Sequence, residues 1–224
     1  AGGLEPDHSF RTAPWRTITK LDVGQSELSP ALVAHIRQLP SLQCLAAPLS
    51  TDSIRLAASL LRLRAFEITT GQAGSDLSRQ LSALSQIERL SVVGGGRELL
   101  EAVAQLSGLR ALSLFEIITD LRGPTFMCWP DGLRKLELGL VMVPGLADQF
   151  GSLVELRDLS LSAHGGQITD QILGALPASP LKRLDIVSVQ DPSARELTRF
   201  VDLEALHVRE GPIDASAARR VAER

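Results

Sequence analysis

Three side chains of the kinds that serine hydrolases use recur at nearly equal intervals: Ser160, Asp185 and His207 follow one another after 25 and 22 residues. Nucleophilic catalysis needs the imidazole between the hydroxyl and the carboxylate, so that it accepts the serine proton while the acid orients it. Here the carboxylate occupies the middle place, and an exposed row of side chains supplies no oxyanion hole. We therefore interpret these residues as part of a surface, and we predict no catalytic residues and no enzymatic activity.

Metal sites and phosphate loops are the next chemistries to consider. The four histidines, His8, His35, His164 and His207, are widely separated, and neither cysteine has a second one nearby, so the spacing fits no metal site. The glycine-rich stretch 94–96 lacks the Lys-Ser/Thr pair that binds phosphate and magnesium in a P-loop. A tight turn between a strand and a helix explains it better. We expect no metal ion and no cofactor.

Composition narrows the class of protein further. The chain has 224 residues, 44% of them hydrophobic, which is enough apolar material for a sizeable core. We find no apolar run long enough for a membrane span and no signal-peptide pattern in the first residues. The net charge is -3, with cations and anions mixed along the sequence. That mixture gives no electrostatic footprint for nucleic acid or a membrane surface, so we expect neither as a partner.

The cysteines indicate the compartment. Cys44 and Cys128 lie far apart in the sequence, which we expect to place them beyond the reach of a disulfide. Asparagine is absent, so no N-glycosylation acceptor exists, and the preference for arginine over lysine is typical of a GC-rich, bacterial genome. We expect an intracellular, cytoplasmic protein, with a secreted bacterial effector acting inside a host cell as the alternative.

One phrase of the form apolar-x-x-apolar-x-apolar dominates the sequence and occurs nine times. Its first residues are Ile18, Leu42, Leu63, Ile87, Leu109, Leu133, Leu156, Leu181 and Leu203. They are separated by 24, 21, 24, 22, 24, 23, 25 and 22 residues. Such regular self-similarity is the signature of a repeat protein.

Each repeat is predicted to contain a strand and then a helix. Positions alternate toward the end of each phrase, as in residues 112–114, where a serine stands between two leucines, which favours a short strand with one buried face. Between phrases, apolar residues fall on one helical stripe, as at Leu99, Val103 and Leu106. Ser29 before Pro30 marks a helix start, and Asp52 and Thr169 are expected to mark others.

The phrase resembles the leucine-rich-repeat family, whose consensus is L-x-x-L-x-L-x-x-N/C-x-L. The resemblance implies an α/β solenoid, a right-handed β-α superhelix with a parallel concave sheet and helices on the convex side. We expect an N-terminal cap or linker over residues 1–17, the repeat domain over 18–213 and a C-terminal capping helix over 214–224. The family's Asn/Cys position is held here by other residues, among them Ser50, Gly95 and Ile117, so the loop amides need other acceptors. Helical periodicity is also interrupted over 121–131, where we expect a loop.

If the fourth and sixth positions of the phrase point inward, the third and fifth positions form two outward rows. The third-position row is Lys20, Cys44, Ala65, Arg89, Ala111, Lys135, Asp158, Arg183 and Ala205. The fifth-position row is Asp22, Ala46, Glu67, Ser91, Ser113, Glu137, Ser160, Asp185 and His207. At single positions, mutual neutralisation on a solvated face explains the charges equally well. For the array as a whole, we predict a binding surface.

The predicted binding residues are the charged members of these rows together with two residues that directly follow a phrase. They are Lys20, Asp22, Glu67, Arg89, Phe115, Lys135, Glu137, Asp158, Arg183, Asp185, His207 and Arg209. Phe115 is interpreted as a hydrophobic anchor for a partner, with packing against Phe126 and Met127 as the alternative. Trp129 is expected in the core in place of a leucine, with contact to a partner as the alternative.

The predicted function is a protein-protein interaction module that binds a partner mainly through the concave strand face. The alternative is the substrate-recognition part of a larger effector or ubiquitin-ligase-type protein, which rests on family analogy alone. We expect one protein partner and a monomeric chain when that partner is absent.

Overall fold

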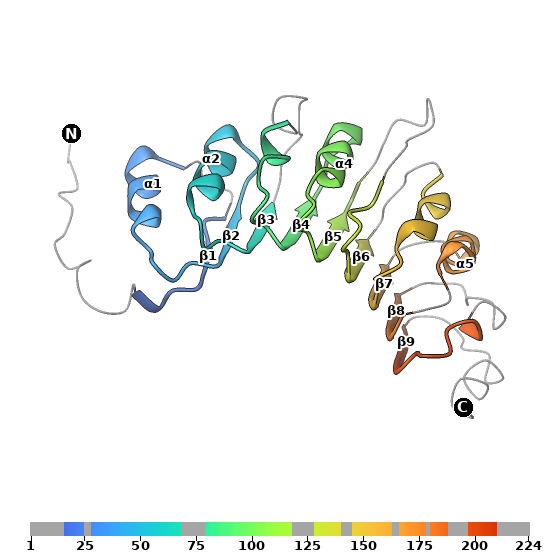
Figure 1. Cartoon of the computed structure of the whole chain (residues 1–224). Helices are drawn as coiled ribbons and strands as arrows, with labels where there is room; N and C mark the ends of the chain where they lie inside the picture. Colours follow the sequence, from blue (N-terminus) through green and yellow to red (C-terminus); the bar gives the residue numbers. More distant parts are fainter. Residues whose placement is uncertain are drawn as a thin grey trace.

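Nine short strands lie side by side along an arc in the computed structural model of the chain (Figure 1). The structure describes residues 16–24, 28–68, 79–117, 128–139, 145–162, 166–177, 180–187 and 197–209. The strands are β1 (Lys20–Asp22), β2 (Cys44–Ala47), β3 (Ala65–Ile68), β4 (Arg89–Val93), β5 (Ala111–Phe115), β6 (Lys135–Gly139), β7 (Asp158–Ser162), β8 (Arg183–Val187) and β9 (Ala205–Arg209). They form one sheet in sequence order, β1 to β9, which confirms the predicted strand of every phrase.

All neighbouring strands are parallel and pair without a shift in register. Leu90, Leu112 and Leu136, which hold the fourth position of three successive phrases, face one another across β4, β5 and β6. Their side chains are at most 2% exposed. Because a strand turns successive side chains to opposite faces, the sixth-position residues share this buried face. The repeat thus stacks its leucines into one continuous core.

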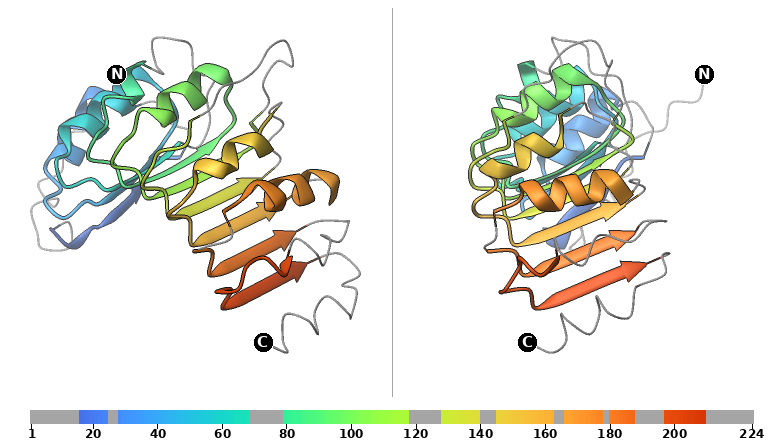
Figure 2. Two further views of the ribbon diagram at one scale, coloured as in Figure 1. Left: turned by 45° about the vertical axis from the view of Figure 1, so that its right-hand side comes forward. Right: turned by 90° about the vertical axis from the view of Figure 1, so that its right-hand side faces the viewer.

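Helices cover that buried face and leave the other face of the sheet open (Figure 2). They are α1 (Pro30–Arg37), α2 (Thr51–Ser59), α4 (Arg97–Ala104) and α5 (Gly166–Ala175), with a 3-10 helix, η3, at Ala147–Ser152. The arrangement confirms the predicted α/β repeat solenoid. In η3, a left-handed Gly145 precedes the helix and Gly151 lies inside it, and glycine disfavours a regular α-helix.

The helix starts agree with the prediction at one site and differ at two. Ser29 accepts a hydrogen bond from the Leu32 amide and Pro30 is the first helical residue, as expected. Asp52 is not the cap of α2, because Ser50 caps the helix in a reciprocal pair with Ser53. Thr169 does not start α5 either, since that helix begins at Gly166. Both helices begin before the polar residue that the sequence predicted as their start.

In two of the turns that lack the family's asparagine, the amide directly after the strand donates to a backbone carbonyl of the next repeat. The Gly94 amide donates to the Phe115 carbonyl at 2.8 Å, and the Glu116 amide donates to the Gly139 carbonyl at 2.9 Å. These bonds continue the sheet pairing by one residue beyond β4 and β5, so carbonyls of the next repeat satisfy these two amides. Ile117, at one asparagine position, is fully buried and adds to the core.

The region before β6 has no helix in its described part, residues 128–134, in agreement with the expected loop. Trp129 is 3% exposed and packs edge-on against Phe150 with ring centroids 5.7 Å apart. The prediction that it replaces a core leucine is therefore confirmed.

The predicted caps lie almost wholly outside the described residues, which begin at 16 and end at 209. Phe126 and Met127 also lie outside them. The proposed domain boundaries remain predictions. Within the described part of the chain, no helix is both long and apolar enough to cross a membrane.

Candidate functional site

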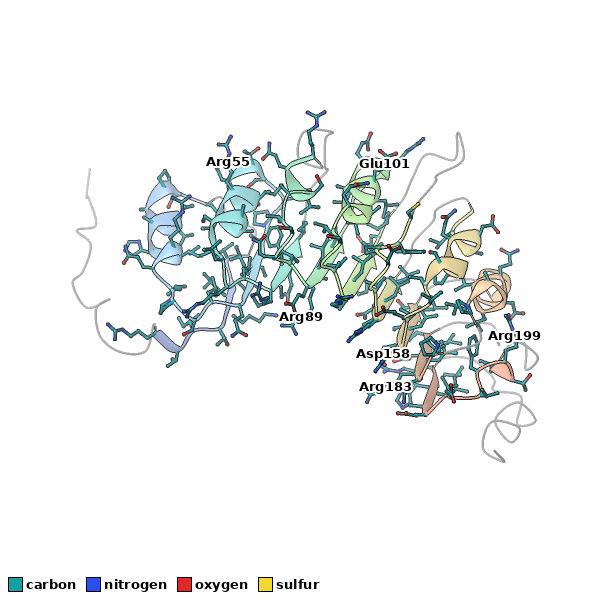
Figure 3. The ribbon with its side chains drawn as sticks, viewed as in Figure 1. Arg55, Arg89, Glu101, Asp158, Arg183 and Arg199 are labelled. Carbon is teal, nitrogen blue, oxygen red and sulfur yellow. The ribbon has the colours of Figure 1, made fainter. Side chains whose placement is uncertain are left out.

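The open face of the sheet carries the third- and fifth-position rows, as the alternation predicts. Lys135 and Glu137 point away from the core on β6, between the buried Leu136 and Leu138. Figure 3 shows Arg89, Asp158 and Arg183 on the strand side of the arc, whereas Arg55 and Glu101 lie on the helical side. The concave face, defined here as these two rows, is therefore a charged surface on a rigid sheet.

At the N-terminal end, an ion pair covers part of this face. The Lys20 ammonium on β1 reaches over β2 and donates to both Glu67 oxygens on β3, at 2.8 and 3.0 Å. Beneath it, Cys44 is 8% exposed and Ala46 is 1% exposed. The expectation that every member of the two rows is exposed is wrong here, because a long cation and its carboxylate close over two small side chains.

The same ion pair sets the chemistry of the cysteine below it. Burial, together with a hydrogen bond from Cys44 Sγ to Glu67 Oε1 at 3.4 Å, raises the pKa of the Cys44 thiol above its ordinary value. The contact with Glu67 also raises the pKa of Lys20. Cys44 is therefore a neutral thiol and Lys20 a cation at neutral pH. Both Cys44 and Cys128 are free, as expected.

A groove of about 470 Å³ runs along this face from β1 to β6. Alanines at 65 and 111 form low points in its floor, and Arg89 and Lys135 stand beside them. Ser91 and Ser113 line the adjoining part. The strands are evenly spaced, so the hollow does not come from a gap in the sheet. It forms where small side chains lie between the long side chains of cations.

Charges in the middle of the concave face are not neutralised by one another. Glu137 accepts a hydrogen bond from the Ser113 hydroxyl at 3.1 Å. Arg89 and Lys135 make no ion pair within 4.0 Å with any residue that the structure describes. Asp22, at the N-terminal edge, accepts from the Gly24 amide at 2.8 Å. The two central cations therefore have no direct ion pair among the described residues, and their role in binding stays a prediction.

The C-terminal strands are more fully paired. Asp158 lies 3.9 Å from Arg183, and Asp185 lies 3.0 Å from Arg209. Ser160, Asp185 and His207 are aligned on β7, β8 and β9, in that order. The carboxylate thus separates the hydroxyl from the imidazole and is engaged by Arg209, an arrangement that does not assemble a catalytic triad.

Phe115 lies at the end of β5, opposite Gly139 of β6. A Cβ atom at Gly139 would come within 2.5 Å of Phe115 Cδ1, so the ring packs over the glycine. The side chain remains half-buried. The structure thus gives Phe115 an intramolecular contact that neither sequence interpretation included, while its predicted role as an anchor stays a prediction.

No group of three or more metal-ligating side chains occurs among residues that the structure describes. His164 and His8 lie outside them, and His35 and His207 lie on different repeats. We therefore assign no metal-binding role to any described residue.

The repeat, the unshifted parallel register and the helices on a single face decide the fold. The chain has a leucine-rich-repeat fold. A leucine at the fourth position of most phrases stacks on its equivalent in the next repeat, which is the defining contact of such solenoids.

Comparison with known proteins gives structural likenesses only. No protein-family model matches the chain, and no curated protein is significantly similar to it in sequence. An internalin from Listeria monocytogenes is 15% identical with a TM-score of 0.43, covering 85% of this chain and 61% of its own. A leucine-rich-repeat protein from Leptospira interrogans is 15% identical with a TM-score of 0.45, covering 93% and 59%.

A second Listeria monocytogenes internalin, C2, is 17% identical with a TM-score of 0.47, covering 78% of this chain and 74% of its own. This leucine-rich-repeat chain spans about 60% of the length of the first internalin and of the Leptospira protein, with 61% and 59% covered. At such scores the likenesses carry no inference about function, and the fold assignment rests on the chain's own repeat and sheet.

Sequence reasoning missed a third row, at the second position of the phrase, directly before each strand. It consists of Thr19, Gln43, Arg64, Glu88, Arg110, Arg134, Arg157, Lys182 and Glu204. Backbone bonds such as Arg134 amide to Arg110 carbonyl, at 2.8 Å, align these residues from repeat to repeat. Tabulating every position of the phrase, and not only the expected strand, would have revealed the row.

Proposed function

We propose that the chain is a non-enzymatic binding module that holds a protein partner on its concave face. The observation that supports this most directly is the open, grooved side of the sheet, whose opposite side is sealed by helices. A rigid sheet presents its side chains at fixed spacing, so a partner meets a surface that needs little reordering. The unpaired Arg89 and Lys135 beside the groove leave charge available to that partner.

The same face serves the alternative function. Recognition of a substrate for an enzyme elsewhere in a larger protein would use the groove in the same way. The order of Ser160, Asp185 and His207 gives no support to catalysis by the described residues themselves.

A matched pair of substitutions tests the face that binds. Ala111→Trp places an indole in the groove between Arg89 and Lys135 and removes no charge. Ala58→Trp places the same side chain on the exposed surface of α2, on the helical side. Random twelve-residue peptides displayed on phage are selected on the unmodified chain, and the enriched clones are measured on both variants. We expect Ala111→Trp to weaken binding at least tenfold and Ala58→Trp to leave it within twofold.

Circular dichroism of both variants verifies that the fold is kept. Clones that bind Ala111→Trp as well as the unmodified chain would contradict the concave face as the binding surface. Clones whose binding is weakened by Ala58→Trp but not by Ala111→Trp would assign the binding site to the helical side.

A further inference from the structure

Positive charge is concentrated along the strand-entry edge of the solenoid, defined here as the second and third phrase positions, where each strand begins. From the third to the eighth repeat, the second and third phrase positions hold eight cations and two carboxylates. The cations are Arg64, Arg89, Arg110, Arg134, Lys135, Arg157, Lys182 and Arg183, and the carboxylates are Glu88 and Asp158. The whole chain has a net charge of -3, so this edge is opposite in sign to the molecule.

Cations at the two ends of the edge are already paired. Arg64 lies 3.4 Å from Glu88, and Lys182 forms an ion pair with Glu204. Arg183 lies 3.9 Å from Asp158. These contacts neutralise the flanks of the edge within the protein itself.

The centre of the edge is different. Arg89, Arg110, Lys135 and Arg157 are all exposed, and none has a carboxylate within 4.0 Å among the residues that the structure describes. Arg110 donates to the Gly132 carbonyl at 3.1 Å, which holds its side chain beside β6 without neutralising it. Arg134 lies among them but is 3.4 Å from Glu155. We call these four unpaired cations the central basic patch.

The geometry points to an acidic, extended polypeptide segment as the ligand of the central basic patch. This inference rests on the proposed function and adds the chemistry of the partner. Its side-chain carboxylates pair with Arg89, Arg110, Lys135 and Arg157, while its small residues enter the groove over Ala65 and Ala111. At the flanks of the edge, the cations pair with Glu88, Asp158 and Glu204 of the protein itself. At the centre of the edge, the partner segment supplies the carboxylates.

Spacing supports an extended segment that crosses the strands. Arg89 and Lys135 are separated by one intervening strand, hence by about 9.6 Å, and an extended chain advances roughly 3.3 Å per residue. Carboxylates three residues apart in the partner therefore match these two cations. Arginine favours such contacts because its planar guanidinium binds a carboxylate through two parallel hydrogen bonds.

Two observations favour a polypeptide over a nucleic acid. Glu137 stands on the same face with no cation within 4.0 Å among the described residues and would repel a continuous phosphate backbone, whereas an acidic peptide can place a neutral residue opposite it. The three rows also contain no Phe, Tyr or Trp, and nucleic-acid strands are commonly bound by stacking on such rings. Electrostatic attraction makes either ligand salt-sensitive, so the two must be compared directly.

Fluorescence anisotropy with defined probes tests the inference. The probes are a fifteen-residue peptide of Ser and Gly with Glu at every third position, the same peptide with Gln or Lys for Glu, and single-stranded oligothymidylate of fifteen nucleotides. The patch variant is Arg89→Ala/Lys135→Ala/Arg157→Ala. Its control is Arg37→Ala/Arg55→Ala/Arg97→Ala, which lowers the net charge equally but changes only exposed helical residues.

We expect the Glu peptide to bind at least tenfold more tightly than the Gln and Lys peptides at low salt. The patch variant should lose at least tenfold in affinity, and the control variant should stay within threefold. Circular dichroism verifies the fold, and Arg89→Gln, which keeps most of the side-chain stem, gives the same test with a smaller loss. Equal binding of the Glu and Gln peptides, or equal losses in both triple variants, would overturn the inference. Tighter, patch-dependent binding of oligothymidylate would assign the patch to nucleic acid instead.

The phage selection separates this inference from the proposed function. Clones that are lost on Ala111→Trp but show no excess of Asp and Glu leave the concave face as the binding surface and refute the acidic ligand. Clones that are insensitive to Ala111→Trp refute the proposed function itself.

Discussion

Replacing Leu90 with lysine should lower the free energy of unfolding by about 3–5 kcal/mol, because an unpaired ammonium would enter the core. Leu90 is 2% exposed and lies between Phe66 and Leu112 in the register of the sheet. None of its neighbours on that face offers a carboxylate, since the fourth-position row is apolar throughout. Urea denaturation followed by circular dichroism measures the change.

The matched substitution is one residue away. Ser91→Lys puts the same side chain on the open face, opposite Glu67, and should change the free energy of unfolding by less than about 1 kcal/mol. A similar cost for Leu90→Lys and Ser91→Lys would contradict the alternation from which both rows are derived.

Phe150→Ala carries the second large effect. Phe150 is fully buried and contacts Trp129 edge-on, at 5.7 Å between ring centroids. Losing the ring leaves a cavity and removes the aromatic contact, so the free energy of unfolding should fall by about 3–5 kcal/mol. Denaturant unfolding monitored by tryptophan fluorescence reports on it directly, because Trp129 is the other member of the pair.

Val154 provides the control for that experiment. It lies in the same repeat and is 60% exposed, so Val154→Ala should cost less than about 0.5 kcal/mol. A loss for Phe150→Ala no larger than that for Val154→Ala would show that η3 does not close the core at this repeat.

The sheet could be predicted from the sequence because every repeat has the same apolar pattern and must bury it against its neighbours. A buried leucine at the fourth position must stack on the next repeat, so nine equivalent phrases specify nine aligned strands. The place of Trp129 in the core followed from the same phrase. Helix boundaries were less predictable, since Ser50 and Asp52 are both good caps and tertiary packing decides between them.

The site was only partly predictable. The two outward rows follow from strand alternation, but the closure of Lys20 and Glu67 over Cys44 depends on side-chain reach across two strand intervals. The mixed order of charges along the sequence also conceals their segregation in space. Arg110, Arg134 and Arg157 are separated by more than twenty residues each, yet the register brings them to one edge.

Lysine footprinting tests the recognition face most directly. The chain has three lysines, at 20, 135 and 182, and Arg55→Lys adds a reporter on the helical side. Acetylation with a succinimidyl ester is followed by mass spectrometry, with and without a peptide from the phage selection. We predict that bound peptide protects Lys135 at least fivefold and leaves the introduced lysine at position 55 unprotected. Protection at position 55, with Lys135 still freely acetylated, would contradict binding on the concave face.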